Sequence, residues 1–287
     1  MSANLLYLET LRKQLREAGA LSPRAEAEQM MSHYGRMKRI DIYAGTRQLS
    51  YTAKIAITRA VAKRGRGIPL GHITGTSPFL GRLFSVSADV LIPRPETERL
   101  VEEVLHVLGA NYEGKKPEIL DLGTGTGCIA ASLTLEWPAC RMTALDASKK
   151  ALAIARKNFD SLGLHQKIKT VESVLFKRFG KKKAFWDVIV SNPPYIPSSD
   201  LSRLSREVKS EPRLALDGGP EGLRLVQEIL KEAPKRLTPG GWLLMEIGKG
   251  QSKKISKKWA GRKEYASLAF KKDLNGIERI LVARVNG

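Results

Sequence analysis

The stretch Ile119-Leu120-Asp121-Leu122-Gly123-Thr124-Gly125-Thr126-Gly127 constrains the fold more than any other part of the chain. Its apolar start predicts a buried strand, its glycines permit a tight turn that a ligand can approach, and the residues that follow predict a helix. The start of a helix offers unpaired N–H groups to a carboxylate or a phosphate. The order strand, glycine loop, helix therefore predicts a nucleotide-type site in an α/β fold.

Helical and extended patterns alternate along the chain after residue 95. This alternation predicts a mostly parallel sheet covered on both faces. A final pair of short alternating runs predicts an antiparallel C-terminal hairpin. The expected helices are 96–109, 127–136, 148–162 and 221–236, and the expected strands are 117–122, 141–146, 167–172, 186–191, 241–247, 265–270 and 276–284.

The first 78 residues have a helical pattern. Four leucines from Leu5 to Leu15 share one helical face, and Gly19 can end that helix. Ser22 and Pro23 predict the cap and first turn of a second helix. Further helices are expected at 36–44 and 52–63, so this part predicts a small helical bundle.

Residues 79–92 change to short alternating runs, which predict a β-hairpin or an extended connector. At 287 residues and 42% hydrophobic composition, the chain exceeds one typical domain and has ample material for a core. We therefore expect an N-terminal helical domain at 1–78, a hairpin connector at 79–95 and an α/β domain at 96–287.

An acidic residue, Asp146, ends the second expected strand, about twenty residues beyond the glycines. A carboxylate at this place can receive both hydroxyls of a ribose, so the spacing fits a cofactor that contains adenosine. The spacing is Gly-x-Gly-x-Gly and not the Gly-x-Gly-x-x-Gly of NAD sites, which argues against an NAD site without excluding it. Asp121 is either a ligand or a brace for the loop.

The tetrapeptide Asn192-Pro193-Pro194-Tyr195 follows the apolar run 188–190. A planar amide or aryl amine nitrogen is a poor nucleophile, so methylating it requires acceptors around its N–H bonds. The Asn192 side-chain oxygen and the Pro193 carbonyl can supply two acceptors, and Tyr195 can supply an aromatic wall. An ordinary proline turn is the alternative interpretation.

Together these segments resemble the class I S-adenosylmethionine-dependent methyltransferases, with a Rossmann-like domain. The blocks at 69–75, 79–81, 90–98, 211–219, 240–248 and 273–279 further resemble the PrmC (HemK) family over nearly the whole chain. That family methylates the glutamine of the Gly-Gly-Gln loop in class I peptide chain release factors. The resemblance implies S-adenosylmethionine as cofactor, S-adenosylhomocysteine as product, a release factor as protein substrate, and substrate recognition by the helical domain.

The resemblance also implies site residues. The glycine loop would line the methionine and adenosine parts of the cofactor, and Asp146 the ribose. The candidate cofactor-binding residues are Gly123, Thr124, Gly125, Thr126, Gly127, Asp146, Leu175 and Asn192; the candidate substrate-binding residues are Asn192, Pro193, Pro194 and Tyr195, of which Asn192, Pro193 and Tyr195 are the catalytic candidates.

Three further positions keep open interpretations. Arg94 and Glu96 either buttress the site or form a salt bridge or helix cap. Glu246 is interpreted as bracing the end of its strand. The chain also departs from many relatives, because Val174 stands where they have an acid before the phenylalanine of this loop. Leu175 can still pack on the adenine face, while the group that recognises the adenine amino nitrogen stays open.

The chain has 49 Lys and Arg against 29 Asp and Glu, a net charge of +20. The basic residues concentrate in Lys177-Arg178, in Lys181-Lys182-Lys183 and in 249–272. Such a field could bind nucleic acid weakly and nonspecifically, or be a solvated basic surface. Cys128 and Cys140 lack metal or redox spacing, and no metal site is expected. With no secretory leader and no apolar run of membrane-spanning length, we expect a cytoplasmic monomer.

Two rival functions remain for this sequence. A nucleic-acid amino methyltransferase, acting on adenine or guanine, could use the same Asn-Pro-Pro-Tyr loop. A noncatalytic binding module could keep the fold and contact nucleic acid, although an intact glycine loop and tetrapeptide argue against it.

Overall fold

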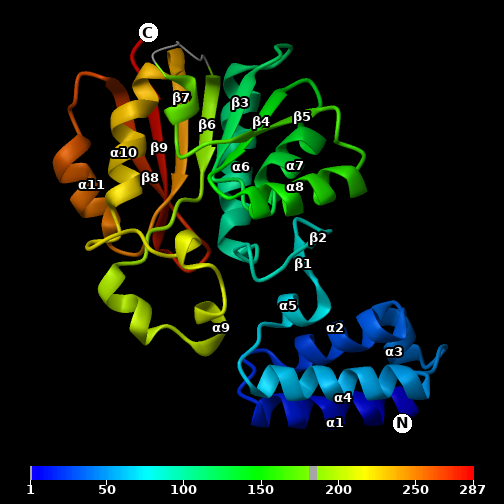
Figure 1. Ribbon diagram of the computed structural model, residues 1–287. Coiled ribbons are helices and arrows are strands. Elements are labelled where there is room, and N and C mark those ends of the chain that lie inside the picture. The colour runs from blue at the N-terminus through cyan, green and yellow to red at the C-terminus, as the bar shows by residue number, and fades with distance from the viewer. Residues whose placement is uncertain (1, 181–185) are drawn as a thin grey trace. The chain divides into compact units, whose positions relative to one another are not determined.

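The computed structural model describes residues 2–180 and 186–287. The lysines at 181–183 lie outside this part of the chain. The fold divides into two compact units. The helical unit comprises Met1–Thr76 and Leu204–Ser210, and the α/β unit comprises Ser77–Arg203 and Glu211–Gly287 (Figure 1). A short segment from the second half of the chain is therefore part of the helical unit.

The helical unit forms around the predicted leucine face. Leu8, Leu11 and Leu15 are buried, whereas Leu5 is only partly buried and packs at the edge of the same core. Ser2 caps the first helix by accepting a hydrogen bond from the Leu5 amide. The helices are α1 (Ala3–Glu17), α2 (Pro23–Gly35), α3 (Arg39–Ala44), α4 (Tyr51–Gly65), α5 (Leu70–Thr74) and, from the returning segment, α9 (Arg206–Lys209). The sequence did not predict α5 or α9.

A buried arginine holds the returning segment in the helical unit. The guanidinium of Arg64, whose side chain is 3% exposed, donates to both carboxylate oxygens of Glu26, at 2.7 and 3.1 Å. Its remaining terminal nitrogen lies 2.7 Å from a carboxylate oxygen of Glu207 on α9. One cation therefore joins α2, α4 and α9.

A hairpin of β1 (Thr76–Phe79) and β2 (Arg82–Ser85) lies at the boundary between the units in the chain. It starts three residues before the range predicted for it, and the alternating run at 88–92 forms no strand. Both turn residues, Leu80 and Gly81, have positive φ (45° and 72°), as a tight two-residue hairpin turn requires. The Leu80 amide donates to Glu98 at 2.7 Å, which ties the turn to the following helix.

The α/β unit has one seven-stranded sheet in the described residues, in the order β5-β4-β3-β6-β7-β9-β8. Neighbouring strands from β5 to β7 pair in parallel, and β9 pairs antiparallel with both β7 and β8. This arrangement confirms the predicted mostly parallel sheet with a C-terminal antiparallel hairpin. The strands are β3 (Glu118–Leu122), β4 (Arg141–Asp146), β5 (Ile168–Glu172), β6 (Trp186–Ser191), β7 (Leu237–Glu246), β8 (Tyr265–Lys272) and β9 (Glu278–Val285).

Alternate residues of the strands pack into two separate cores, one on each face of the sheet. On β3, Ile119 joins the core beneath α6, α7 and α8, while its neighbour Leu120 joins the core beneath α10 and α11. The helices are α6 (Pro95–Asn111), α7 (Cys128–Glu136), α8 (Lys149–Ser161), α10 (Arg224–Glu232) and α11 (Gln251–Trp259), with 3₁₀ turns η1 (Lys177–Phe179), η2 (Ser198–Arg203), η3 (Arg213–Ala215) and η4 (Ala233–Lys235). Within the described ranges, no helix is long and apolar enough to cross a lipid bilayer.

Candidate functional site

The strand order brings three of the sequence segments together. β3 lies between β4 and β6, and all three strands run in the same direction. Their carboxyl ends lead into the glycine loop, Asp146 and Asn192, respectively. The chain leaves β3 toward β4 and later returns to the other side of β3 as β6, and this switch point is where open α/β sheets bind ligands.

The three glycines of the loop do two different jobs. All have positive φ, at 82°, 54° and 79° for Gly123, Gly125 and Gly127. A methyl group on Gly127 would lie 2.5 Å from the Phe159 ring, so this glycine permits close packing of the loop on α8. A methyl group on Gly123 or Gly125 would meet no atom within 4 Å. The first two glycines therefore leave open backbone that a ligand can approach.

Two aspartates hold the loop from different sides. Asp146 accepts hydrogen bonds from the Gly125 amide at 2.9 Å and the Ser148 amide at 2.8 Å, and burial raises its pKa. Asp121 is fully buried and accepts from the Thr124 hydroxyl at 2.6 Å and from the amide of Ala130 at 3.2 Å. Burial raises the pKa of Asp121 to about 7. Of the two interpretations left open for Asp121, the geometry therefore gives it the bracing role.

Leu175 follows β5 in a conformation that is rare for a branched side chain. Its φ is +47°, and its side chain is half-buried against the core that contains Phe176. Non-glycine residues in the left-handed region cost about 1–3 kcal/mol and cluster at ligand sites. Val174 beside it is half exposed. The Ser173 amide donates to the Asp146 carbonyl at 2.9 Å, which joins this loop to the carboxyl end of β4. The backbone therefore presents Leu175 next to that end of the strand.

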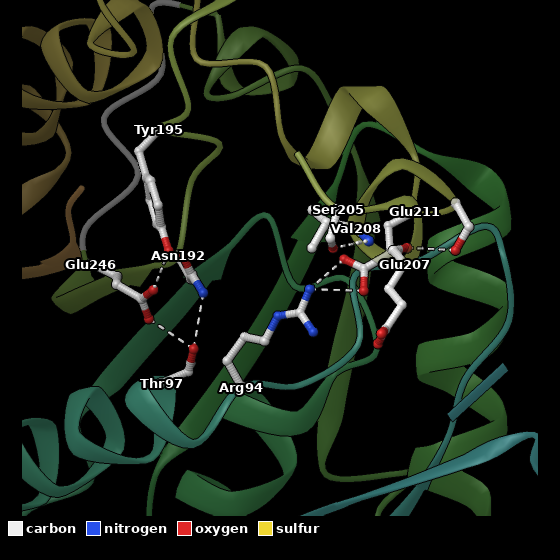
Figure 2. A network of polar contacts seen from close by, with 10 residues as sticks. Arg94, Thr97, Asn192, Tyr195, Ser205, Glu207, Val208, Glu211 and Glu246 are labelled. Carbon is white, nitrogen blue, oxygen red and sulfur yellow. Dashed lines mark hydrogen bonds and ion pairs between the residues drawn. The ribbon is translucent and has the colours of Figure 1, made fainter. Parts of the chain in front are cut away.

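The Asn-Pro-Pro-Tyr loop is anchored by a hydrogen-bond network (Figure 2). The Asn192 side-chain NH2 donates to the Thr97 hydroxyl at 3.0 Å, which donates to Glu246 at 2.7 Å. The other carboxylate oxygen of Glu246 accepts from the Tyr195 hydroxyl at 2.9 Å. Burial raises the pKa of Glu246, whereas the hydroxyls of Thr97 and Tyr195 and the charge of Arg279 act against that rise.

Gln251 and Gly222 fix the backbone of the same loop. The Gln251 side-chain NH2 donates to the carbonyls of Tyr195 at 2.9 Å and Gly222 at 3.2 Å. A methyl group on Gly222 would lie 2.1 Å from the Tyr195 carbonyl oxygen, so only glycine fits there. Among the described residues, no hydrogen bond uses the Pro193 carbonyl. The loop is therefore rigid around an available backbone acceptor.

Of the roles left open for Arg94, the structure shows the salt bridge. One terminal nitrogen of its guanidinium lies 2.8 and 2.7 Å from the two carboxylate oxygens of Glu211. This salt bridge joins two of the blocks that resemble the PrmC family, and it lies within the α/β unit (Figure 2). Glu96 lies in the first turn of α6, where a carboxylate complements the helix dipole.

Sequence reasoning missed part of this arrangement. The sequence pattern does not single out Thr97 or Gln251, and it assigns Glu246 only to bracing the end of its strand. Thr97 belongs to the Ile-Pro-Arg-Pro-Glu-Thr-Glu stretch of the connector block, which indicates that the segment matters but not that this hydroxyl contacts Asn192. Gln251 offered no signal, since it begins α11, a helix that the sequence pattern did not predict.

The sheet order, the open glycine loop and the anchored Asn-Pro-Pro-Tyr loop define a class I methyltransferase with S-adenosylmethionine as its cofactor. The family model for the methyltransferase small domain matches residues 100–207, and the model for the PrmC N-terminal domain matches residues 7–75. A methyltransferase structure from Pyrococcus furiosus shares the fold, with a TM-score of 0.53 at 18% identity over 82% of this chain and 98% of that one.

Curated relatives identify the family. The release factor glutamine methyltransferase of Geobacter sulfurreducens is 36% identical over 97% of this chain and 95% of its own length. The protein of the same name from Rhodopirellula baltica is 36% identical over 93% of this chain and 90% of its own. The chain belongs to the release factor glutamine methyltransferase family. The comparisons confirm both the predicted fold class and the predicted family.

Proposed function

We propose that this protein transfers a methyl group from S-adenosylmethionine to the side-chain amide nitrogen of the glutamine in the Gly-Gly-Gln loop of class I peptide chain release factors. The observation that supports this most is the orientation of Asn192. Its side-chain NH2 group donates a hydrogen bond to the Thr97 hydroxyl, so its side-chain oxygen is left as an acceptor for a substrate. An available acceptor suits an incoming NH2 group.

The cofactor fits the residues at the switch point. Gly123 and Gly125 offer backbone with open space beside it, and Asp146 is anchored next to them by the Gly125 amide. We assign the methionine and adenosine parts to residues 123–127, the ribose to Asp146 and the adenine face to Leu175. The cofactor supplies an activated methyl group on a positively charged sulfur.

The protein's contribution is to position and polarise the substrate nitrogen. The Asn192 oxygen and the Pro193 carbonyl accept from its two N–H bonds, which holds the amide still and favours positive charge growing on nitrogen. The Tyr195 ring forms the wall beside the flat group, and Pro194 keeps the loop extended. The surplus proton passes to water, so no strong base is required.

Radioactive methyl transfer tests the assignment. Asn192→Ala should lower the turnover of release factor at least 100-fold while the Kd for S-adenosylhomocysteine changes little. Asp146→Ala should instead raise that Kd first, by about 10-fold or more, because it removes a ribose acceptor. Equal losses of turnover and cofactor affinity in the two variants would contradict the separate roles.

The same assay separates the rival functions. Release factor, DNA and RNA are offered in parallel, and methyl transfer to release factor alone is expected. Transfer to nucleic acid would support the amino methyltransferase alternative, which the names of the curated relatives do not favour. Cofactor binding without transfer to any of the three would support the binding module.

The helical unit recognises the protein substrate in this proposal, because one glutamine offers too little surface for selectivity.

The protein is proposed to act as a monomer, which light scattering tests. The lysine clusters at 177–178, 181–183 and 249–272 are proposed to make weak, nonspecific contact with nucleic acid. Binding that persists at high salt, or is absent at low salt, would contradict this contact.

A further inference from the structure

Asn192, Thr97 and Glu246 form one chain of hydrogen bonds from residues far apart in the sequence. Asn192 is 95 positions from Thr97, and Thr97 is 149 positions from Glu246. Thr97 is 3% exposed in the first turn of α6, and Glu246 is 1% exposed at the end of β7. Thr97 and Glu246 are therefore shielded from water, which cannot replace their hydrogen bonds.

An asparagine side chain can turn by 180° with almost no change of shape. Such a turn exchanges its oxygen for its NH2 group. In one orientation Asn192 offers an acceptor to a substrate amide, and in the other it offers a donor that faces another donor. The activity proposed above therefore depends on which end of this amide faces the substrate.

The direction of the chain is set by Glu246. Both carboxylate oxygens of Glu246 accept hydrogen bonds, one from the Thr97 hydroxyl and the other from the Tyr195 hydroxyl, so the single hydrogen of the Thr97 hydroxyl is used at Glu246. The Thr97 oxygen then has only lone pairs for its other neighbour. It can pair with the NH2 end of Asn192 and not with the oxygen. The carboxylate thus fixes the orientation of an amide that it does not touch.

We propose that Thr97 and Glu246 are positioning residues, which hold the Asn192 amide with its oxygen toward the substrate nitrogen. This inference rests on the proposed function. The Tyr195 hydroxyl occupies the second oxygen of Glu246, so both carboxylate oxygens are committed as acceptors. Glu246 therefore does more than brace the end of β7, the role that the sequence suggested.

Three substitutions test the direction of the chain. Thr97→Val keeps the shape of the side chain and removes the hydroxyl, and Thr97→Ser keeps the hydroxyl. Glu246→Gln keeps the shape but introduces a donor that can reverse the chain. Thr134→Val is the matched control, because the buried Thr134 hydroxyl donates to the Ala130 carbonyl of its own helix, at 2.8 Å, and is not part of the network around Asn192.

Thr97→Val and Glu246→Gln should each lower kcat for release factor methylation by about 10- to 100-fold, the usual cost of losing an outer partner of a site residue. The Kd for S-adenosylhomocysteine should stay within about threefold of wild type in both variants. Thr97→Ser and Thr134→Val should keep kcat near the wild-type value. Wild-type kcat in Thr97→Val, or an equal loss in Thr134→Val, would overturn the proposal.

Hydrogen exchange of the Asn192 side-chain NH2, followed by NMR on ¹⁵N-labelled protein, requires no protein substrate. One of its two protons should exchange slowly in the wild type and in Thr97→Ser, and both should exchange fast in Thr97→Val. Identical exchange in all three would overturn the positioning role. Absence of methyl transfer by the wild-type protein would overturn the proposed function instead, so the two failures are distinguishable.

Discussion

Gly123 and Gly127 occupy the same loop with nearly the same φ, yet the structure predicts opposite consequences for replacing them with alanine. At Gly127 the new methyl group would lie 2.5 and 2.7 Å from two carbons of the Phe159 ring. At Gly123 it would meet no atom within 4 Å. The first substitution therefore acts on packing, and the second acts on the space that we assign to the cofactor.

The expected stability losses follow from two contributions. The left-handed backbone conformation costs a non-glycine residue about 1–2 kcal/mol at either position. Overpacking against a buried ring adds about 1–3 kcal/mol at Gly127 alone. The free energy of unfolding should therefore fall by about 2–5 kcal/mol in Gly127→Ala and by about 1–2 kcal/mol in Gly123→Ala.

Urea unfolding and calorimetric titration with S-adenosylhomocysteine measure the two effects separately. Gly163→Ala is the control, since Gly163 also has positive φ (69°) and open space, but it follows α8 outside the site. Gly123→Ala should match this control in stability and bind the cofactor product at least about 10-fold more weakly, a loss of about 1.4 kcal/mol. Affinity equal to that of the control would refute the assignment of Gly123. Stability of Gly127→Ala equal to that of the control would refute the packing argument.

Two further predictions concern buried charges. Arg64→Met should lower stability by about 2–4 kcal/mol, because two carboxylates lose their shared cation, whereas Glu207→Gln should cost about 1 kcal/mol or less; equal losses in urea unfolding would contradict this. The pKa of Asp121 is raised from 3.8 to about 7, so its ionisation destabilises the folded state progressively between these pH values. The stability of Asp121→Asn relative to wild type should therefore rise from pH 4 to pH 8, and a constant difference would disprove the assignment.

The sheet was predictable because β3 and β6 carry apolar runs that end in turn residues, and because the C-terminal pair shows short alternating runs. The missed elements lack such a signal. β1 (Thr76–Phe79) contains Pro78, which argues against a strand. α5 has five residues, too few to show a period. In α11 only two of nine residues, Ile255 and Trp259, are apolar, so its lysines hide the helical pattern.

The candidate site also contains residues that the sequence predicts and residues that it does not. Asp146 and Asn192 could be proposed from sequence because Asp146 ends one strand and Asn192 directly follows another, and carboxyl ends of parallel strands gather at one edge. Thr97 and Glu246 could not, because hydrogen bonding between distant side chains leaves no periodic trace. Their role depends on the register in which β6 and β7 pair, and the sequence pattern does not predict that register.

That alignment is visible in the pairing of β6 with β7. Ser191 is the register partner of Met245, so the residues that follow them, Asn192 just beyond β6 and Glu246 at the end of β7, lie beside each other. Successive side chains of a strand point to opposite faces, and a slip of one residue would turn Glu246 away from Thr97. The orientation of the Asn192 amide is therefore determined by strand register as much as by the tetrapeptide itself. It follows that the same four residues on a sheet of different register would form only a turn.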